Sequence, residues 1–158
     1  MSLTSTVRPK PFIDFGNNDP GILAIINFDK PLGIVINSLA DMILRRNSSL
    51  TVCEREWIAS EVSAANNTEF CANSHFAFCK AANGGEAPSI SPKMAALKEI
   101  AIFVATAPMG SHMNPFLIES AIMLKATPME VHEVITIASA FCFFNRMVMF
   151  ENTPIPSD

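Results

Sequence analysis

The feature that most constrains this chain is the regular division of its apolar segments by helix start and stop signals. Thr51 with Glu54 three residues later is a capping-box pattern. Thr127-Pro128-Met129-Glu130 combines an N-cap residue, a first-turn proline and a capping-box glutamate. Between such signals apolar residues recur at helical spacing, and the strict alternation typical of strands is absent. The sequence therefore predicts an all-α protein.

Helix signals and turn residues together predict seven helical segments. These segments cover residues 21–27, 31–46, 51–65, 68–83, 91–107, 117–126 and 127–150. A chain of 158 residues has the length of one domain. We expect a single domain with an N-terminal arm (1–19), a helical core (20–150) and an extended tail (151–158).

The composition indicates association through apolar surface. Hydrophobic residues make up 49% of the chain and charged residues 16%, which is more apolar surface than a small monomer easily hides. We therefore expect a homo-oligomer. The net charge is −4, and the one basic pair is Arg45-Arg46, so nucleic acid is not an expected partner.

Two uncharged segments test whether the chain spans a membrane. Residues 100–118 approach the ~20 residues of a spanning helix, but Pro108, Gly110 and Pro115 interrupt them. Residues 134–144 are too short to span and are typical of a buried helix. Residues 1–10 have no apolar stretch beside their charges, so no secretory signal is expected. These patterns favour a cytoplasmic protein without a membrane partner.

Candidate catalytic side chains gather at the junction of the third and fourth predicted helices. Cys71 and His75 are one helical turn apart. Cys71 lies in the first turn, where the helix dipole and a nearby protonated histidine favour a thiolate. Glu56 on the preceding helix would orient the imidazole if the two helices fold back on each other. This arrangement predicts a Cys-His-Glu relay.

The alternative for these residues is structural. Free cysteines are usually core residues, and Glu56 with Ser60 and Ser63 would also suit a solvated helix face. No metal site or cofactor is expected, because neither His112 nor His132 has a second ligand at metal-binding spacing.

The four cysteines are irregularly spaced, which argues against a disulfide framework. For Cys79 and Cys142 a core role is preferred. Cys79 is eight residues after Cys71, a rise of about 12 Å along a helix, so these two cannot be bridged without unfolding it. Cys53 is a less implausible partner.

The motifs at these residues resemble those of the carboxymuconolactone decarboxylase and alkylhydroperoxidase D-like superfamily, in particular its peroxidase-related branch. The resemblance rests on Glu54-Arg55-Glu56, Val62-Ser63-Ala64-Ala65-Asn66, Cys71-Ala72-Asn73-Ser74-His75, and Phe141 with Asn145-Arg146 in the last helix. It covers roughly residues 20–150. It implies an all-α, alkylhydroperoxidase D-like helical bundle whose chains interlock in pairs and assemble into trimers or hexamers.

The resemblance also implies roles for individual residues. Cys71 would be the peroxidatic cysteine and Glu56 with His75 the proton relay, while Thr68 or Ser63 would supply hydrogen bonds. Redox-active members carry Cys-x-x-Cys, whereas this chain has Thr68 at the first cysteine position, so a sulfenic acid at Cys71 has no resolving thiol three residues away.

Three functions are compatible with this pattern. The preferred one is a thiol-dependent hydroperoxide reductase, an antioxidant protein in which Cys71 is resolved by Cys53 or by an external thiol. The second is a cofactor-free lyase of the decarboxylase type, which uses Glu56 and His75 as acid and base on a small carboxylated lactone. The third is a non-catalytic helical oligomer in which these polar residues satisfy an interface.

Overall fold

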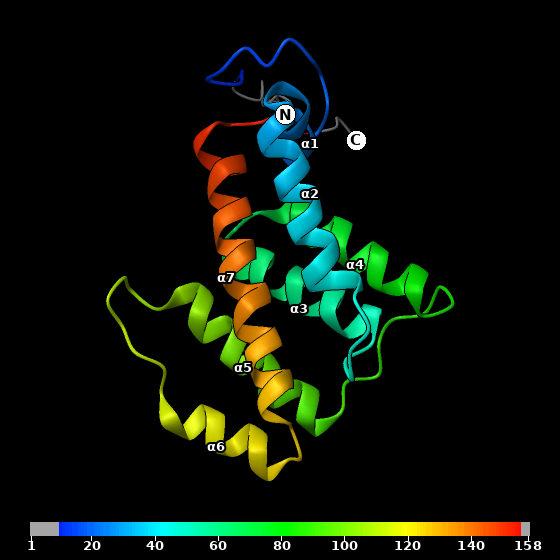
Figure 1. Ribbon diagram of the computed structural model, residues 1–158, viewed down its shortest axis with the longest axis vertical. Coiled ribbons are helices and arrows are strands. Elements are labelled where there is room, and N and C mark those ends of the chain that lie inside the picture. Colours follow the sequence, from blue (N-terminus) through cyan, green and yellow to red (C-terminus); the bar gives the residue numbers. More distant parts are fainter. Residues whose placement is uncertain (1–9, 156–158) are drawn as a thin grey trace, which may run out of the picture.

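The computed structural model describes residues 10–155, which form seven α-helices and no strand (Figure 1). The helices are α1 (Ile22–Phe28), α2 (Lys30–Arg45), α3 (Val52–Ala65), α4 (Glu69–Ala82), α5 (Pro92–Thr106), α6 (Pro115–Met123) and α7 (Pro128–Phe150). The all-α prediction is confirmed. The first nine residues of the predicted arm, with the region searched for a secretory signal, and residues 156–158 of the predicted tail lie outside the described part.

Capping explains where the helices begin. Thr51 accepts a hydrogen bond from the Glu54 amide at 3.1 Å, and the Glu54 carboxylate accepts one from the Thr51 amide at 2.8 Å. Thr127 and Glu130 form the same reciprocal pair at the start of α7. Each box satisfies amides that the first turn leaves unpaired, so both predicted capping boxes are confirmed.

The sixth helix is displaced from its prediction. Asn114 caps α6 by accepting a hydrogen bond from the Phe116 amide at 3.1 Å, so the helix begins at Pro115 instead of residue 117. It ends at Met123, because Lys125 takes a left-handed conformation with φ of 71°. Proline fits the first turn of a helix, where its missing amide hydrogen costs nothing.

The core is built around α3 and α7. Nine of the fourteen residues of α3 are buried, because this helix packs against α4, α5 and α7 together. A helix in that position has little solvated surface, so most polar residues of α3 need partners inside the protein. Fully buried aliphatic side chains join the helices: Ile58, Val62, Leu97, Ile100, Val134 and Ile137.

The helix α7 is long and apolar enough to cross a membrane by length and composition. It also packs against α5 and α3, and Val134, Ile137 and Ala138 within it are fully buried. A central helix of a folded core meets the same length and composition criteria. The assignment of residues 134–144 to a buried helix therefore agrees with the packing.

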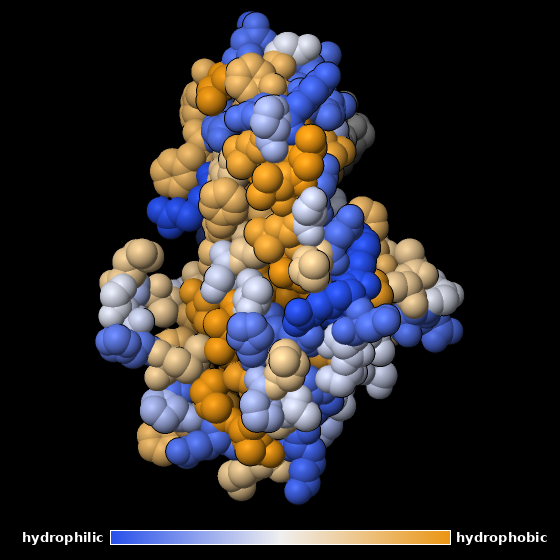
Figure 2. All heavy atoms as spheres, in the orientation of Figure 1, coloured by the Kyte–Doolittle hydropathy of each residue, from blue (hydrophilic) through white to orange (hydrophobic). Residues whose placement is uncertain are grey.

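The pair α1 and α2 leaves an apolar face uncovered. Gly33 lets the two helices approach closely, since a Cβ there would collide with the backbone of Ile26. Figure 2 shows hydrophobic side chains gathered over α2. The exposed apolar residues of this helix are Leu32, Ile34, Val35, Leu39 and Met42, with exposed fractions from 37% to 68%. We call these five residues the α2 face.

The predicted arm contains one residue that belongs to the core. Phe15 is buried with Ala24 and Ile25 of α1, and its ring meets that of Phe28 edge to face. The described part of residues 10–19 is therefore fastened to α1 by an aromatic anchor.

Candidate active site

Four contacts between α3 and α4 set the register of the candidate site. The helices run antiparallel and pack closely, so residues spaced by three and four along each helix meet in successive layers. In order along α3 the layers are the Cys53–Cys79 disulfide, the Glu56–His75 pair, the Ser60 hydrogen bond to the Ala72 carbonyl, and the Ser63 carbonyl accepting from the Thr68 amide.

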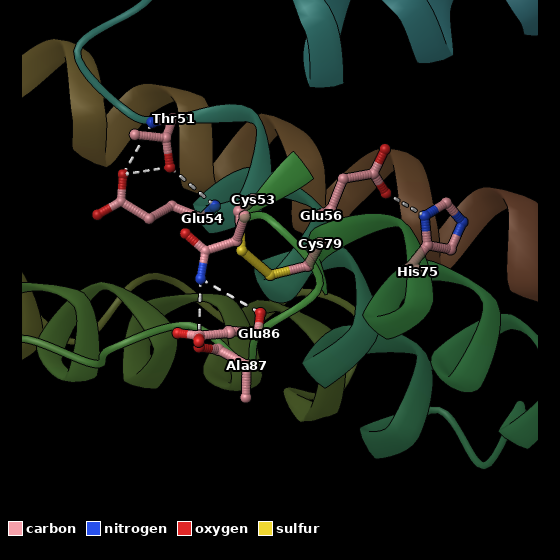
Figure 3. The surroundings of a disulfide bond; sticks show 9 residues. Thr51, Cys53, Glu54, Glu56, His75, Cys79, Glu86 and Ala87 are labelled. Atoms are coloured by element: carbon pink, nitrogen blue, oxygen red, sulfur yellow. Dashed lines mark hydrogen bonds and ion pairs between the residues drawn. A yellow bond between two sulfur atoms is a disulfide. The ribbon is translucent and has the colours of Figure 1, made fainter. Parts of the chain in front are cut away.

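The second layer contains the predicted acid–base pair. His75 Nδ1 lies 2.6 Å from Glu56 Oε2, and Glu56 is completely buried while His75 is 19% exposed (Figure 3). The imidazole meets the ring of Phe141 edge to face at 4.6 Å between centroids, and that of Phe78 at 5.8 Å. The carboxylate and the two rings hold His75 in one orientation. The structure thus brings Glu56 and His75 together as a relay requires.

A third charged group joins this pair from α2. Arg45 Nη2 lies 3.0 Å from Glu56 Oε1, the oxygen that His75 does not contact, and the Arg45 side chain is 45% exposed. Each carboxylate oxygen of Glu56 therefore has a positively charged or proton-carrying neighbour. The sequence did not point to Arg45, because no motif or spacing links residues 45 and 56. Their contact arises from the packing of α2 on α3.

Cys71 lies in the first turn of α4, one turn before His75, and is a half-buried free thiol. Burial raises the pKa of this thiol to about 11. The direction is opposite to the prediction from the helix dipole and a nearby imidazolium. At neutral pH Cys71 is therefore a thiol, and any nucleophilic role requires a base that removes its proton.

Two open hollows flank the first turn of α4. The larger has a volume of about 910 Å³ and is bordered by Thr68, Phe70 and Asn73 together with residues from the end of α7. The smaller, of about 410 Å³, is bordered by Ala64, Ala72 and Asn73. Neither Cys71 nor His75 lines either hollow. The chain neighbours of Cys71 do line them, Phe70 the larger hollow and Ala72 the smaller.

The supporting residues have other partners than those expected. Ser63 is fully buried and its hydroxyl accepts a hydrogen bond from Asn145 Nδ2 at 3.2 Å. Thr68 donates to the Asn66 carbonyl at 3.4 Å and borders the larger hollow. Ser63 therefore ties α3 to α7. Of these two residues, Thr68 is the one that borders a hollow. Asn145, from the final motif of the sequence, is 1% exposed and pairs with Ser63 in the core.

Glu54, Arg55 and Glu56 are consecutive residues with separate roles. Glu54 caps α3, and Glu56 faces His75. Arg55 is 2% exposed, and its Nε and Nη1 have no hydrogen-bond partner among residues 10–155. Burial lowers the pKa of Arg55, while the charge of Glu133 opposes that shift. The motif thus combines a helix start, a buried guanidinium and one member of the acid–base pair.

The cysteine assignments need correction. Cys53 and Cys79 form a disulfide, so the expectation that the chain has no disulfide is wrong, and Cys79 is more than a core side chain. Because Cys53 is bonded to Cys79, it is not a free thiol that could resolve a sulfenic acid at Cys71. Cys142 is half-buried, packs against the core and accepts a hydrogen bond from Asn66 Nδ2 at 3.7 Å.

The α3/α4 register shows how this bond could have been predicted. Cys53 and Cys79 are 26 residues apart on different helices, a spacing that carries no disulfide signal. Cys53 lies one turn before Glu56 and Cys79 one turn after His75, so an antiparallel pairing of Glu56 with His75 places the two cysteines together. The predicted contact between Glu56 and His75 therefore implies the Cys53–Cys79 disulfide.

Comparison with known proteins defines the class of fold. No family model and no curated protein matches the chain. The alkylhydroperoxidase AhpD core of a peroxidase-related protein from Ralstonia eutropha JMP134 matches with a TM-score of 0.73 and 21% identity. A peroxidase-related protein from Silicibacter sp. TM1040 matches with a TM-score of 0.75 and 18% identity. Each match covers 87% of this chain and 77% of the other.

These matches identify the fold as that of the alkylhydroperoxidase D-like, peroxidase-related proteins. At 18–21% identity the likeness is one of fold. The fold that the motif resemblance implies is confirmed.

Proposed function

We propose that this protein is a thiol-dependent hydroperoxide reductase with Cys71 as the nucleophile. The observation that carries the proposal is the buried Glu56–His75 pair, 2.6 Å between Nδ1 and Oε2, held one helical turn from the Cys71 thiol. A thiol whose pKa is raised by burial reacts only when a base takes its proton, and His75 is a base one helical turn away on the same helix.

The proposed reaction has two stages. Cys71 transfers its proton through His75, and its sulfur attacks the outer peroxide oxygen. The O–O bond breaks, Cys71 becomes a sulfenic acid, and the proton completes the alcohol or water that leaves. A small external thiol then displaces water from the sulfenic acid, and a second external thiol releases Cys71 as a thiol. The two electrons come from the external thiols, so this reaction requires no cofactor.

The residues around the pair would divide the remaining tasks. Glu56 stabilises the imidazolium that forms when His75 takes the proton, and Arg45 balances the carboxylate charge. Thr68 borders the larger hollow and would supply a hydrogen bond to the bound peroxide, while Ser63 keeps α3 and α7 in register.

Replacement of Cys71 by serine tests the proposal. With dithiothreitol as reductant and cumene hydroperoxide as substrate, Cys71→Ser should abolish most of the turnover. Cys142→Ser removes the other free thiol of the described chain and should leave turnover unchanged. Equal turnover by wild type and Cys71→Ser would overturn the proposal.

One observation favours a lyase as the second candidate. The acid–base pair is fully assembled while Cys71 stays protonated at neutral pH, so Glu56 and His75 are equipped for proton transfer without a thiolate. A lyase of the decarboxylase type would release CO₂ from a small carboxylated lactone. Cys71→Ser should then retain this activity and His75→Ala should lose it, whereas no CO₂ from any lactone acid would exclude it.

We also propose that the protein is a cytoplasmic homo-oligomer built from pairs of chains, a trimer or a hexamer. The α2 face supports this proposal, because it leaves five large apolar side chains exposed on one helix. Light scattering should give a mass above that of the 17.2 kDa chain. Ile34→Glu, at the most exposed of these positions, should lower it, and Glu61→Gln on α3 is the control.

A further inference from the structure

We propose that Cys53 and Cys79 form a second, two-cysteine redox centre that reduces small hydroperoxides with the same Glu56–His75 pair. The inference rests on the proposed function in its use of hydroperoxide as substrate. It differs in the reacting thiols and does not involve Cys71.

The position of the disulfide in the α3/α4 register carries the proposal. Cys53 lies one turn before Glu56 on α3, and Cys79 lies one turn after His75 on α4. The acid–base pair therefore has Cys71 one turn away on one side and the disulfide one turn away on the other. Figure 3 shows the disulfide and the Glu56–His75 pair next to each other between the same two helices.

Cys53 and Cys79 also supply the resolving thiol that Cys71 lacks. A sulfenic acid at Cys71 has no thiol partner three residues away, because Thr68 occupies that position. Cys53 and Cys79 are already bonded to each other, so each is within reach of the other as a resolving thiol. A complete two-thiol cycle is therefore available at this end of the interface, and the chain offers the same acid–base groups to it.

The environment assigns different roles to the two sulfurs. Cys53 lies in the first turn of α3, where the positive end of the helix dipole stabilises a thiolate, and is 6% exposed. Cys79 is completely buried in the middle of the core contacts. Cys53 is thus the thiol that meets the peroxide, and Cys79 is the thiol that resolves it.

The reaction balances with a named reductant. In the reduced form Cys53 gives its proton to His75 and its sulfur attacks one peroxide oxygen. The O–O bond breaks, and water, or the alcohol of an organic hydroperoxide, leaves with the proton delivered through His75. Cys79 then attacks the sulfenic sulfur of Cys53, the S–S bond forms, and water leaves. An external dithiol such as dithiothreitol attacks Cys53, releases Cys79 and becomes the disulfide, so that it supplies both electrons.

Burial defines the substrate class. Cys53 is 6% exposed and Cys79 is completely buried, so the centre favours small hydroperoxides over bulky organic ones. The substrate is therefore a small hydroperoxide, of which hydrogen peroxide is the simplest.

The test uses a variant that retains only this pair of cysteines. Cys71→Ser/Cys142→Ser keeps the disulfide and hence the fold of the α3/α4 interface. The folded protein is reduced with excess dithiothreitol, freed of reductant and given one equivalent of hydrogen peroxide. It is then quenched with an alkylating agent and mapped by mass spectrometry. The inference predicts two alkylated cysteines before peroxide and a restored Cys53–Cys79 disulfide after it.

Further variants sharpen the test. Adding Cys79→Ser should leave a trappable sulfenic acid on Cys53, and adding His75→Ala should slow restoration of the disulfide by about a hundredfold. Cumene hydroperoxide should restore it more slowly than hydrogen peroxide. Circular dichroism of each variant shows that the helices remain intact.

Two results would overturn the inference. One is a disulfide that dithiothreitol does not reduce without denaturant, and the other is a reduced pair that peroxide leaves as two thiols. Either outcome is independent of the proposed function, because that proposal is read from Cys71 in the wild-type protein. Conversely, a silent Cys71 together with rapid restoration of Cys53–Cys79 would reject the first proposal and retain the second.

Discussion

Two buried glutamates in this protein, Glu56 in α3 and Glu130 at the start of α7, have nearly the same exposure and different partners. Glu130 accepts hydrogen bonds from the Lys93 ammonium at 2.7 Å, the Thr127 amide at 2.7 Å and the Ser49 hydroxyl at 3.1 Å. Glu56 faces His75 at 2.6 Å and Arg45 at 3.0 Å. Glu130 is 2% exposed and Glu56 is 0% exposed.

The difference between them separates a structural site from a chemical one. Burial alone would raise the pKa of Glu130, but the hydrogen bonds from Lys93, Thr127 and Ser49 outweigh it and lower the pKa. Glu130 therefore stays ionised and joins α7 to its neighbours. Glu56 instead has an imidazole nitrogen of His75 as its nearest contact, a group that can donate or accept a hydrogen bond. Since both carboxylates are buried to nearly the same extent, the difference between the two sites lies in their partners.

The largest expected effect comes from His75. His75→Ala should lower hydroperoxide turnover by about a hundredfold or more, because the thiol then loses its base. Steady-state kinetics with dithiothreitol and cumene hydroperoxide measures it. Glu130→Gln, in a carboxylate of similar burial, should leave turnover unchanged. Equal losses in the two variants would remove the distinction between the two sites.

Stability should respond in the opposite way. Glu130→Gln should lower the free energy of unfolding by about 2 kcal/mol, because charge-assisted hydrogen bonds to a buried carboxylate are lost and Lys93 keeps its charge. Urea denaturation followed by circular dichroism measures the change. A variant as stable as the wild type would show that Glu130 contributes no more than a surface carboxylate.

The stabilisation that Glu130 provides should depend on pH. The folded pKa of Glu130 lies below its unfolded value of about 4.3, so its contribution is complete above that value and is lost as pH falls through the folded pKa. Unfolding free energies of wild type and Glu130→Gln should therefore converge in acid. Curves that stay parallel below pH 4 or so would contradict the lowered pKa.

The smallest effect is expected at Arg45. Its side chain is half exposed, and an ion pair of that kind contributes about 1 kcal/mol or less. Arg45→Gln should therefore reduce turnover by no more than about fivefold. Arg46→Gln is the matched control on the next residue, because Arg46 pairs with Glu133 at 2.7 Å, away from His75. A loss as large as that of His75→Ala would assign Arg45 a direct part in the reaction.

Most of the fold could be predicted from local signals. The capping boxes at Thr51 and Thr127 set two helix starts, and proline and glycine mark most of the other boundaries. The end of α6 was misplaced, because a left-handed Lys125 has no residue-type signal of the kind a glycine gives. The start of α6 was also misplaced by two residues, although Asn114 and Pro115 are a cap residue and a first-turn proline.

The site was only partly readable from the sequence. Glu56 and His75 meet as their motif spacing suggests, because the motifs fix both helices and a short turn joins them. The contact of Arg45 with Glu56 and the Cys53–Cys79 bond depend on how helices pack, which spacing within one helix does not encode. The raised pKa of Cys71 depends on burial, which a prediction based on the helix dipole does not take into account.

The most direct test of the account is to trap Cys71 during its reaction with peroxide. Protein with the Cys53–Cys79 disulfide intact has Cys71 and Cys142 as its free thiols in the described chain. It is treated with stoichiometric cumene hydroperoxide and a sulfenic-acid trap, and peptides are mapped by mass spectrometry. The account predicts an adduct on Cys71, none on Cys142, and a strongly slowed reaction in His75→Ala. An unmodified Cys71 would contradict it.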